Sequence, residues 1–118
     1  MHARKTGALI EASAVAGATM AGADQATIDA VAAFGREIGL AFQIVDDILD
    51  VEGTSADLGK TAGKDAAAGK PTYPSLFGLE RSKALAAEAR ARARAALETA
   101  RLGGHLERLA DLVVARRA

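Results

Sequence analysis

Apolar residues recur every three or four positions through most of the chain, which is the spacing of amphipathic helices. The pattern predicts a first helix from Arg4 to about Met20 and a second from Gln25 to Glu52. Asp24 is expected to cap the second helix, because its side chain can accept hydrogen bonds from unpaired backbone N–H groups. Gly53 is expected to end it, since glycine commonly follows a helix C-terminus. The apolar face of the first helix is predicted to consist of Leu9, Ala12, Val15, Ala16 and Met20.

The second half of the chain predicts shorter helices that follow one long connection. Residues 53–71 show no helical pattern, and irregular connections longer than about 12–15 residues are usually functional or disordered. A short helix is expected to start at residues 72–75 and to end near Leu79. Longer helices are expected over Ser82 to Ala100 and from about His105 to Ala115. The expected fold is therefore all-α, with four to five helices and one lysine-containing loop.

Composition supports helices and excludes several classes of protein. Of the 118 residues, 30 are alanine and 3% are aromatic, so helices are favoured but few large side chains can fill a core. The length allows at most one domain. The absence of cysteine excludes disulfides and thiolate metal sites. No uninterrupted apolar run reaches 18 residues and no signal-peptide pattern is present, so neither a membrane span nor secretion is expected. A cytoplasmic location is the default prediction.

Charge is balanced overall but divided along the chain. Residues 1–59 contain three Lys or Arg and nine Asp or Glu, a net charge of −6, and residues 60–118 contain twelve and six, a net charge of +6. Such halves could bind a metal and a polyanion between them. They could also simply attract each other. Basic residues are not interleaved with aromatic ones, so nucleic-acid binding is not expected.

The stretch from Phe42 to Asp50 carries three carboxylates within an apolar segment. At about 100° per residue, Gln43, Asp46, Asp47 and Asp50 share one side of the second helix. Like charges three and four residues apart repel, and carboxylates near a helix C-terminus oppose its dipole. A bound cation would relieve both penalties, and oxygen ligands without Cys or His suit Mg2+. The alternative is a solvated acidic helix end.

Two smaller features accompany the acidic stretch. Gly35 and Gly39 lie two turns and one turn before Gln43, on the same stripe of the helix. They indicate either close packing of another helix or a narrow ligand channel, with equal weight. Lys5 and Thr6 lie near the start of the first helix, where an anion could bind. An exposed lysine is the simpler interpretation of that pair.

Taken together, these segments resemble a known family. The string FQIVDDILD, followed by LGKTAGKD and GKPTYP, is similar to the second aspartate-rich region of the trans-type isoprenyl diphosphate synthases, the polyprenyl synthetase family. Lys5 and Thr6 fit the upstream KT motif of this family. The resemblance implies that residues 1–118 form the C-terminal part of one isoprenoid-synthase helical domain. It also implies head-to-tail condensation of isopentenyl diphosphate with an allylic diphosphate through Mg2+-assisted departure of diphosphate.

The resemblance also implies roles for individual residues. The three aspartates would hold Mg2+ on the allylic diphosphate: Asp46, Asp47 and Asp50. Three lysines would bind diphosphate oxygens, the last as a weaker match: Lys5, Lys60 and Lys70. Two further side chains would offer oxygen dipoles to the carbocation: Thr6 and Gln43.

The sequence departs from the family in its length. Family members are much longer and carry a first aspartate-rich region, which is found nowhere in these 118 residues. The chain by itself is therefore expected to be inactive, and to act as a homodimer or with a missing N-terminal half. Two alternatives are a non-catalytic helical subunit that pairs with a full-length synthase and a fragment that is molten in isolation. The residues that would set product length are not identified.

Overall fold

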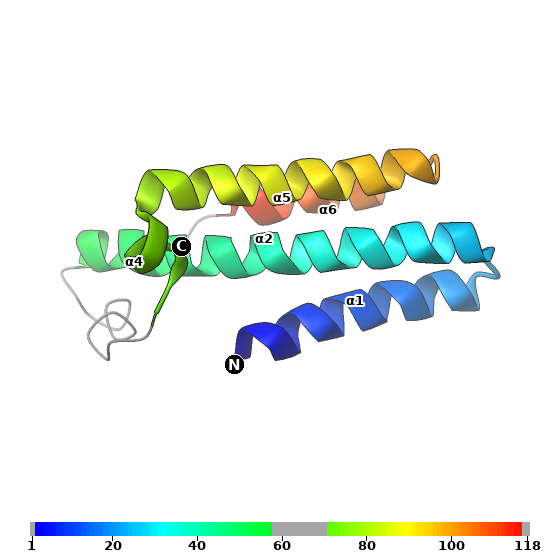
Figure 1. Cartoon of the computed structure of the whole chain (residues 1–118), viewed down its shortest axis with the longest axis horizontal. Helices are drawn as coiled ribbons and strands as arrows, with labels where there is room; N and C mark the ends of the chain where they lie inside the picture. Colours follow the sequence, from blue (N-terminus) through cyan, green and yellow to red (C-terminus); the bar gives the residue numbers. More distant parts are fainter. Residues whose placement is uncertain (1, 58–70, 117–118) are drawn as a thin grey trace.

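The computed structural model describes the backbone of residues 2–57 and 71–116, and the side chains of residues 5–53 and 71–116. Within these ranges the chain forms α-helices and no strands, which confirms the all-α prediction (Figure 1). The helices are α1 (His2–Met20), α2 (Gln25–Asp57), α4 (Tyr73–Phe77), α5 (Leu79–Thr99) and α6 (His105–Ala115).

The longest helix, α2, is the centre of the fold. Helix α1 packs along one side of α2, and α5 packs along the other, with α6 beside α5 (Figure 1). The interface of α2 with α5 and α6 contains two apolar clusters of buried side chains. One consists of Phe34, Ile38, Ala93, Leu97 and Ala110, and the other of Ile44, Val45, Ile48 and Ala86. This side of α2 therefore supplies the core of the described part of the chain.

The interface between α1 and α2 is built differently, because the two backbones come close together at two glycines. A Cβ atom added at Gly35 would lie 2.9 Å from Glu11 Cα, and one at Gly39 would lie 3.0 Å from Gly7 Cα. The glycine stripe thus serves close helix packing, one of the two interpretations that its sequence left open. Arg36 adds an ion pair to Glu11 at 3.0 Å across the same interface.

The apolar face predicted for α1 is wrong in orientation. Leu9 and Met20 are 67% and 88% exposed, whereas Gly7 and Glu11 meet α2. The physical reason is the close backbone contact: a face that carried Leu or Met could not approach the glycines of α2 to this distance. Gly7 and Glu11 therefore face the glycines of α2, and Ile10, which was not in the predicted face, packs against the cluster around Phe34.

The ends of α2 confirm one prediction and correct another. The Asp24 carboxylate accepts a hydrogen bond from the backbone N–H of Thr27 at 2.9 Å, so the N-cap is confirmed. Gly53 is buried and does not end α2, which continues to Asp57. An interior glycine costs only about 1 kcal/mol, which neighbouring helical residues and packing can outweigh. The prediction of an irregular segment is wrong for residues 53–57, and residues 58–70 lie outside the described part of the chain.

Helix α5 begins three residues earlier than its pattern predicts. Ser82, expected to start it, is buried inside the helix, and its hydroxyl donates to the Gly78 carbonyl at 2.7 Å. A serine satisfied by the carbonyl four residues before it is tolerated within a helix. The predicted bounds of the last helix, 105–115, agree with α6.

Candidate functional site

The acidic residues lie inside α2, because this helix continues to Asp57. The predicted conflict with the helix dipole is therefore wrong, since that effect is confined to the last turn. Asp46 and Asp50 are still one turn apart, and carboxylates at this spacing repel each other. Asp46 is exposed, whereas Asp47 and Asp50 are half-buried. Positively charged groups are therefore needed to balance the negative charge of these carboxylates.

An arginine at the end of α6 is a partner of Asp46. The Arg116 Nη2 atom lies 3.0 Å from the Asp46 Oδ1 atom, and it also donates to the Phe42 carbonyl at 3.3 Å. The Arg116 Cζ atom lies 4.2 Å from the centre of the Phe42 ring, within the range of cation–π attraction. The Nε atom of the same side chain is buried and has no hydrogen-bond partner. The positively charged side chain of Arg116 therefore pairs with Asp46, the first aspartate of the motif.

Asp47 connects α2 to α4. Its Oδ2 atom accepts a hydrogen bond from the backbone N–H of Tyr73 at 3.0 Å. The Tyr73 ring packs against the cluster around Ile44, and its centre lies 5.9 Å from that of Phe77. Asp47 thus fixes the start of α4 beside the acidic stretch, in addition to any role toward a ligand.

Helix α1 brings the KT pair to the same region of α2. The contacts of Gly7 with Gly39 and of Glu11 with Gly35 define an antiparallel register. At about 1.5 Å per residue, this register places Lys5 and Thr6 level with α2 between Gly39 and Gln43. Lys5 is exposed, and Thr6 and Gln43 are half-buried. The pair is therefore level with residues about 35 positions later in the sequence.

The described residues offer suitable donors for Mg2+ but only one wall of a metal site. Carboxylates are the hard oxygen ligands that Mg2+ prefers. Within the described ranges, however, no three His, Cys, Asp or Glu side chains converge as a metal-binding group. A Mg2+ ion held by Asp46 and Asp50 would complete its shell with waters and substrate phosphates, as Mg2+ sites often do. Lys60 and Lys70 lie outside the described residues.

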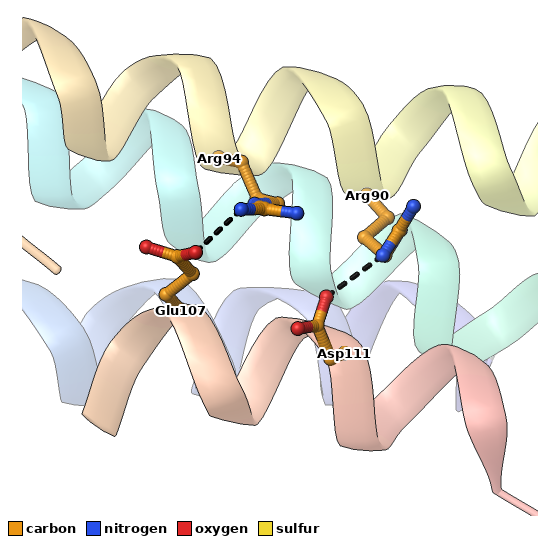
Figure 2. Close-up of polar contacts among 4 residues, drawn as sticks. All are labelled: Arg90, Arg94, Glu107 and Asp111. Atoms are coloured by element: carbon orange, nitrogen blue, oxygen red, sulfur yellow. Dashed lines mark hydrogen bonds and ion pairs between the residues drawn. The ribbon is translucent and has the colours of Figure 1, made fainter. Parts of the chain in front are cut away.

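Ion pairs align the helices that carry the site. Arg90 pairs with Asp111 at 2.8 Å and Arg94 pairs with Glu107, which bridges α5 and α6 at two successive turns (Figure 2). This ladder fixes the position of α6 along α5, and so the place where Arg116 emerges. Between α2 and α5, Lys83 pairs with Glu52 at 3.0 Å. The hydrogen bond from Lys83 to Glu52, reinforced by the carboxylate charge, raises the pKa of the ammonium group.

The two charged halves of the sequence therefore attract each other directly. Ion pairs among the described residues link the acidic half to the basic half across α2, and they include Glu37 with Arg92, Asp46 with Arg116, and Glu52 with Lys83. Of the two interpretations of the charge division, mutual attraction has structural support. The other, a metal and a polyanion between the halves, remains a prediction.

A pocket of about 360 Å3 lies on the side of α2 that faces α5 and α6. Its walls include Val45, Ile48 and Ala86, with Arg116 and the Lys83–Glu52 pair also lining it. Arg116 thus lies between this mostly apolar pocket and Asp46. The described part of the chain contains no helix long and apolar enough to cross a membrane.

Arg116 is the residue of the site that sequence reasoning missed. It lies 74 positions from Phe42, to which it binds, and its helix shows only an ordinary apolar pattern. The available signal was a basic Arg116–Arg117 pair directly after a helix that had to pack on an acidic one. Charge division along the chain pointed to such pairs without identifying this one.

Comparison with curated proteins finds prenyl diphosphate synthases. The chain is 49% identical over 113 residues to the mitochondrial geranylgeranyl pyrophosphate synthase 10 of Arabidopsis thaliana, covering 96% of this chain and 32% of that protein. It is 47% identical over 118 residues to a chloroplastic geranylgeranyl pyrophosphate synthase of Capsicum annuum, covering 98% and 32%. It is 56% identical over 86 residues to a chloroplastic geranylfarnesyl diphosphate synthase of Leucosceptrum canum, covering 73% and 24%. The chain thus spans 24% to 32% of the length of these relatives.

The cytoplasmic location expected from the sequence is contradicted by these relatives, whose names assign them to chloroplasts or mitochondria. The expectation rested on the lack of a targeting pattern near Met1. Targeting segments are short extensions separate from the folded domain. A chain that spans a third of its relatives carries no information about such an extension.

The sequence profile of the polyprenyl synthetase family matches residues 1–103. The match includes α1, α2, α4 and α5, and so contains the KT pair and the acidic stretch. It agrees with the resemblance drawn from the motifs and with the prenyl diphosphate synthases found among curated proteins. The predicted membership in a prenyltransferase family is therefore confirmed: this chain belongs to the polyprenyl synthetase family.

Proposed function

We propose that this chain forms the diphosphate-binding wall of a head-to-tail prenyltransferase. The full reaction would condense isopentenyl diphosphate with an allylic diphosphate. Support comes from the family membership, from the acidic face of α2, and from the KT pair that α1 places beside it. Residues 1–118 would be one incomplete domain, which acts as a homodimer or with an N-terminal portion like that of its longer relatives.

Each side chain of this wall has a proposed task. Asp46, Asp47 and Asp50 would hold Mg2+, and this ion would supply positive charge beside a departing diphosphate. Lysine ammonium groups bind the diphosphate oxygens and stabilise the same charge. These are Lys5, Lys60 and Lys70. The oxygen atoms of Thr6 and Gln43 direct their dipoles toward the carbocation.

The observation that carries this proposal is the antiparallel packing of α1 on α2. Without it, a lysine–threonine pair and an acidic stretch some 40 positions later would be unrelated surface features. The contacts at Gly7 and Gly39 set a register that supports a shared role, because the pair is level with α2 between one and two turns before Asp46. An anion bound to metal at Asp46 and Asp50 would then meet cationic and dipolar groups from a second helix.

Calorimetric titration of the chain with pyrophosphate in excess Mg2+ tests this proposal. Wild type should bind, and Asp46→Asn should weaken binding about tenfold or more, since it removes a charged ligand. Asp29→Asn is the matched control, because Asp29 is an exposed aspartate at the other end of the same helix. Equal binding by wild type and both variants would reject the proposed diphosphate wall.

A further inference from the structure

Arg116 makes three contacts with one turn of α2. Its guanidinium group lies 3.0 Å from the Asp46 carboxylate, donates to the Phe42 carbonyl at 3.3 Å, and stacks over the Phe42 ring at 4.2 Å. We propose that Arg116 is a resident counter-ion of Asp46, which a divalent metal must displace in order to use this carboxylate. This inference rests on the proposed function, because it concerns the same acidic wall.

Competition follows from the chemistry of the two cations. The Arg116 guanidinium binds the Asp46 carboxylate as a cation. It lies 3.0 Å from the Asp46 Oδ1 atom, an oxygen that a metal would also require. A divalent ion bound at that oxygen would stand a few ångströms from the guanidinium and repel it. Metal and arginine therefore compete for this oxygen of Asp46.

The attachment of Arg116 suits exchange. Arg116 directly follows α6 and has extended backbone angles, φ −57° and ψ 146°, so its side chain can move without unwinding the helix. Its Nε atom is buried without a hydrogen-bond partner, which leaves part of its bonding capacity unused. The buried Ala110 meanwhile holds α6 in the apolar cluster around Phe34, and the ion pairs of Arg90 with Asp111 and of Arg94 with Glu107 join α6 to α5 (Figure 2). Arg116 can therefore leave Asp46 and return to it while α6 keeps its position. We call this contact between Arg116 and Asp46 the latch.

The latch lowers the cost of the acidic wall when no metal is bound. Asp46 and Asp50 repel each other one turn apart, and a guanidinium at Asp46 reduces that repulsion. The same contact weakens metal binding, because the ion pair must break first. Arg116 therefore sets the metal affinity of the wall without being one of its ligands.

The test is a titration of the full 118-residue chain with Mn2+, which carboxylate sites accept as they accept Mg2+. Free Mn2+ is measured by electron paramagnetic resonance. Arg116→Gln should bind Mn2+ about two- to fivefold more tightly than wild type, as expected for loss of a partly exposed ion pair. Arg108→Gln, the same charge change at an exposed position of α6, is the matched control for general electrostatics. Far-ultraviolet circular dichroism verifies that each variant is folded.

A double variant isolates the latch from the rest of the site. In Asp46→Asn, the further change Arg116→Gln should bring no gain in affinity, because the competing contact is already absent. Equal affinities of Arg116→Gln and Arg108→Gln, with metal binding still weakened in Asp46→Asn, would overturn the latch while the proposed function stands. No Mn2+ binding by wild type or by Arg116→Gln would overturn both.

Discussion

The two sides of α2 hold their neighbours by opposite means. Toward α1, backbone meets backbone at Gly35 and Gly39, and any added atom would collide. Toward α5 and α6, large side chains such as Phe34 and Ile38 are 2% exposed and fill the interface. The first interface requires glycines, which have no Cβ atom, and the second requires large apolar side chains. Each therefore has its own kind of damaging substitution.

This difference extends to the candidate site. The glycine side leads along the helix to Gln43 and brings the KT pair of α1 to it. On the side of α2 that packs against α5 and α6, Arg116 follows α6 and pairs with Asp46. The acidic wall is thus supported from two directions by interfaces that respond to different changes. Substitutions can separate the two supports.

The largest expected effect comes from removing atoms on the α5 side. Phe34→Ala should lower the free energy of unfolding by about 3–5 kcal/mol, because it leaves a cavity in the main apolar cluster. Urea unfolding followed by circular dichroism measures this loss. Phe77→Ala, the same change at a side chain that is 52% exposed, should cost much less. Equal losses in the two variants would show that the cluster is not the core of the fold.

A smaller effect is expected from adding an atom on the α1 side. Gly35→Ala should destabilise the fold by about 1–3 kcal/mol, since the new Cβ would lie 2.9 Å from Glu11 Cα. Hydrogen exchange should accelerate in α1 and remain slow in α5. Gly17→Ala is the matched control, because nothing lies within 4 Å of that position and alanine favours the helix. If α1 were equally protected in both variants, the close backbone contact would be unnecessary.

The sequence was sufficient where the determinants are local. Helical spacing predicted the described helices, and Asp24 was identified as a cap from its position alone. The acidic motif and the KT pair led to the family that the profile match confirms. All of these depend on residues within a few positions of each other, or on strings specific enough to be read directly.

The sequence was insufficient where contacts join distant segments. Hydrophobicity predicts the wrong inward face for α1, because the close approach of Gly7 to Gly39 turns Gly7 and Glu11 toward α2 instead. Gly53 was assigned to the helix end by its local preference, which its burial overrode. Arg116 pairs with Asp46 because α5 and α6 each run back along α2. Such outcomes depend on packing between helices, which single-residue preferences do not contain.

The smallest expected effect is a pH response that differs between the two sides of α2. At the turn from α1 to α2, hydrogen bonds from Thr27 hold the pKa of Asp24 below its usual range. The stability that this cap contributes is present above the unfolded-state pKa, near about 4, and is lost as pH falls through the lower folded value. On the α5 side, Glu52 raises the pKa of Lys83, so that contribution is present below about pH 10 and is lost as pH rises through the higher folded value.

Thermal unfolding measured from acid to alkaline pH tests this division. Asp24→Asn keeps a capping side chain that cannot titrate, so it should flatten only the acid limb of the profile. Glu52→Gln removes the carboxylate that Lys83 requires and should flatten only the alkaline limb. Both groups are exposed to solvent, so the shifts in melting temperature should be small and should shrink in high salt. If either variant altered both limbs equally, the two sides of α2 would be coupled through the helix, and they would not be independent supports of the acidic wall.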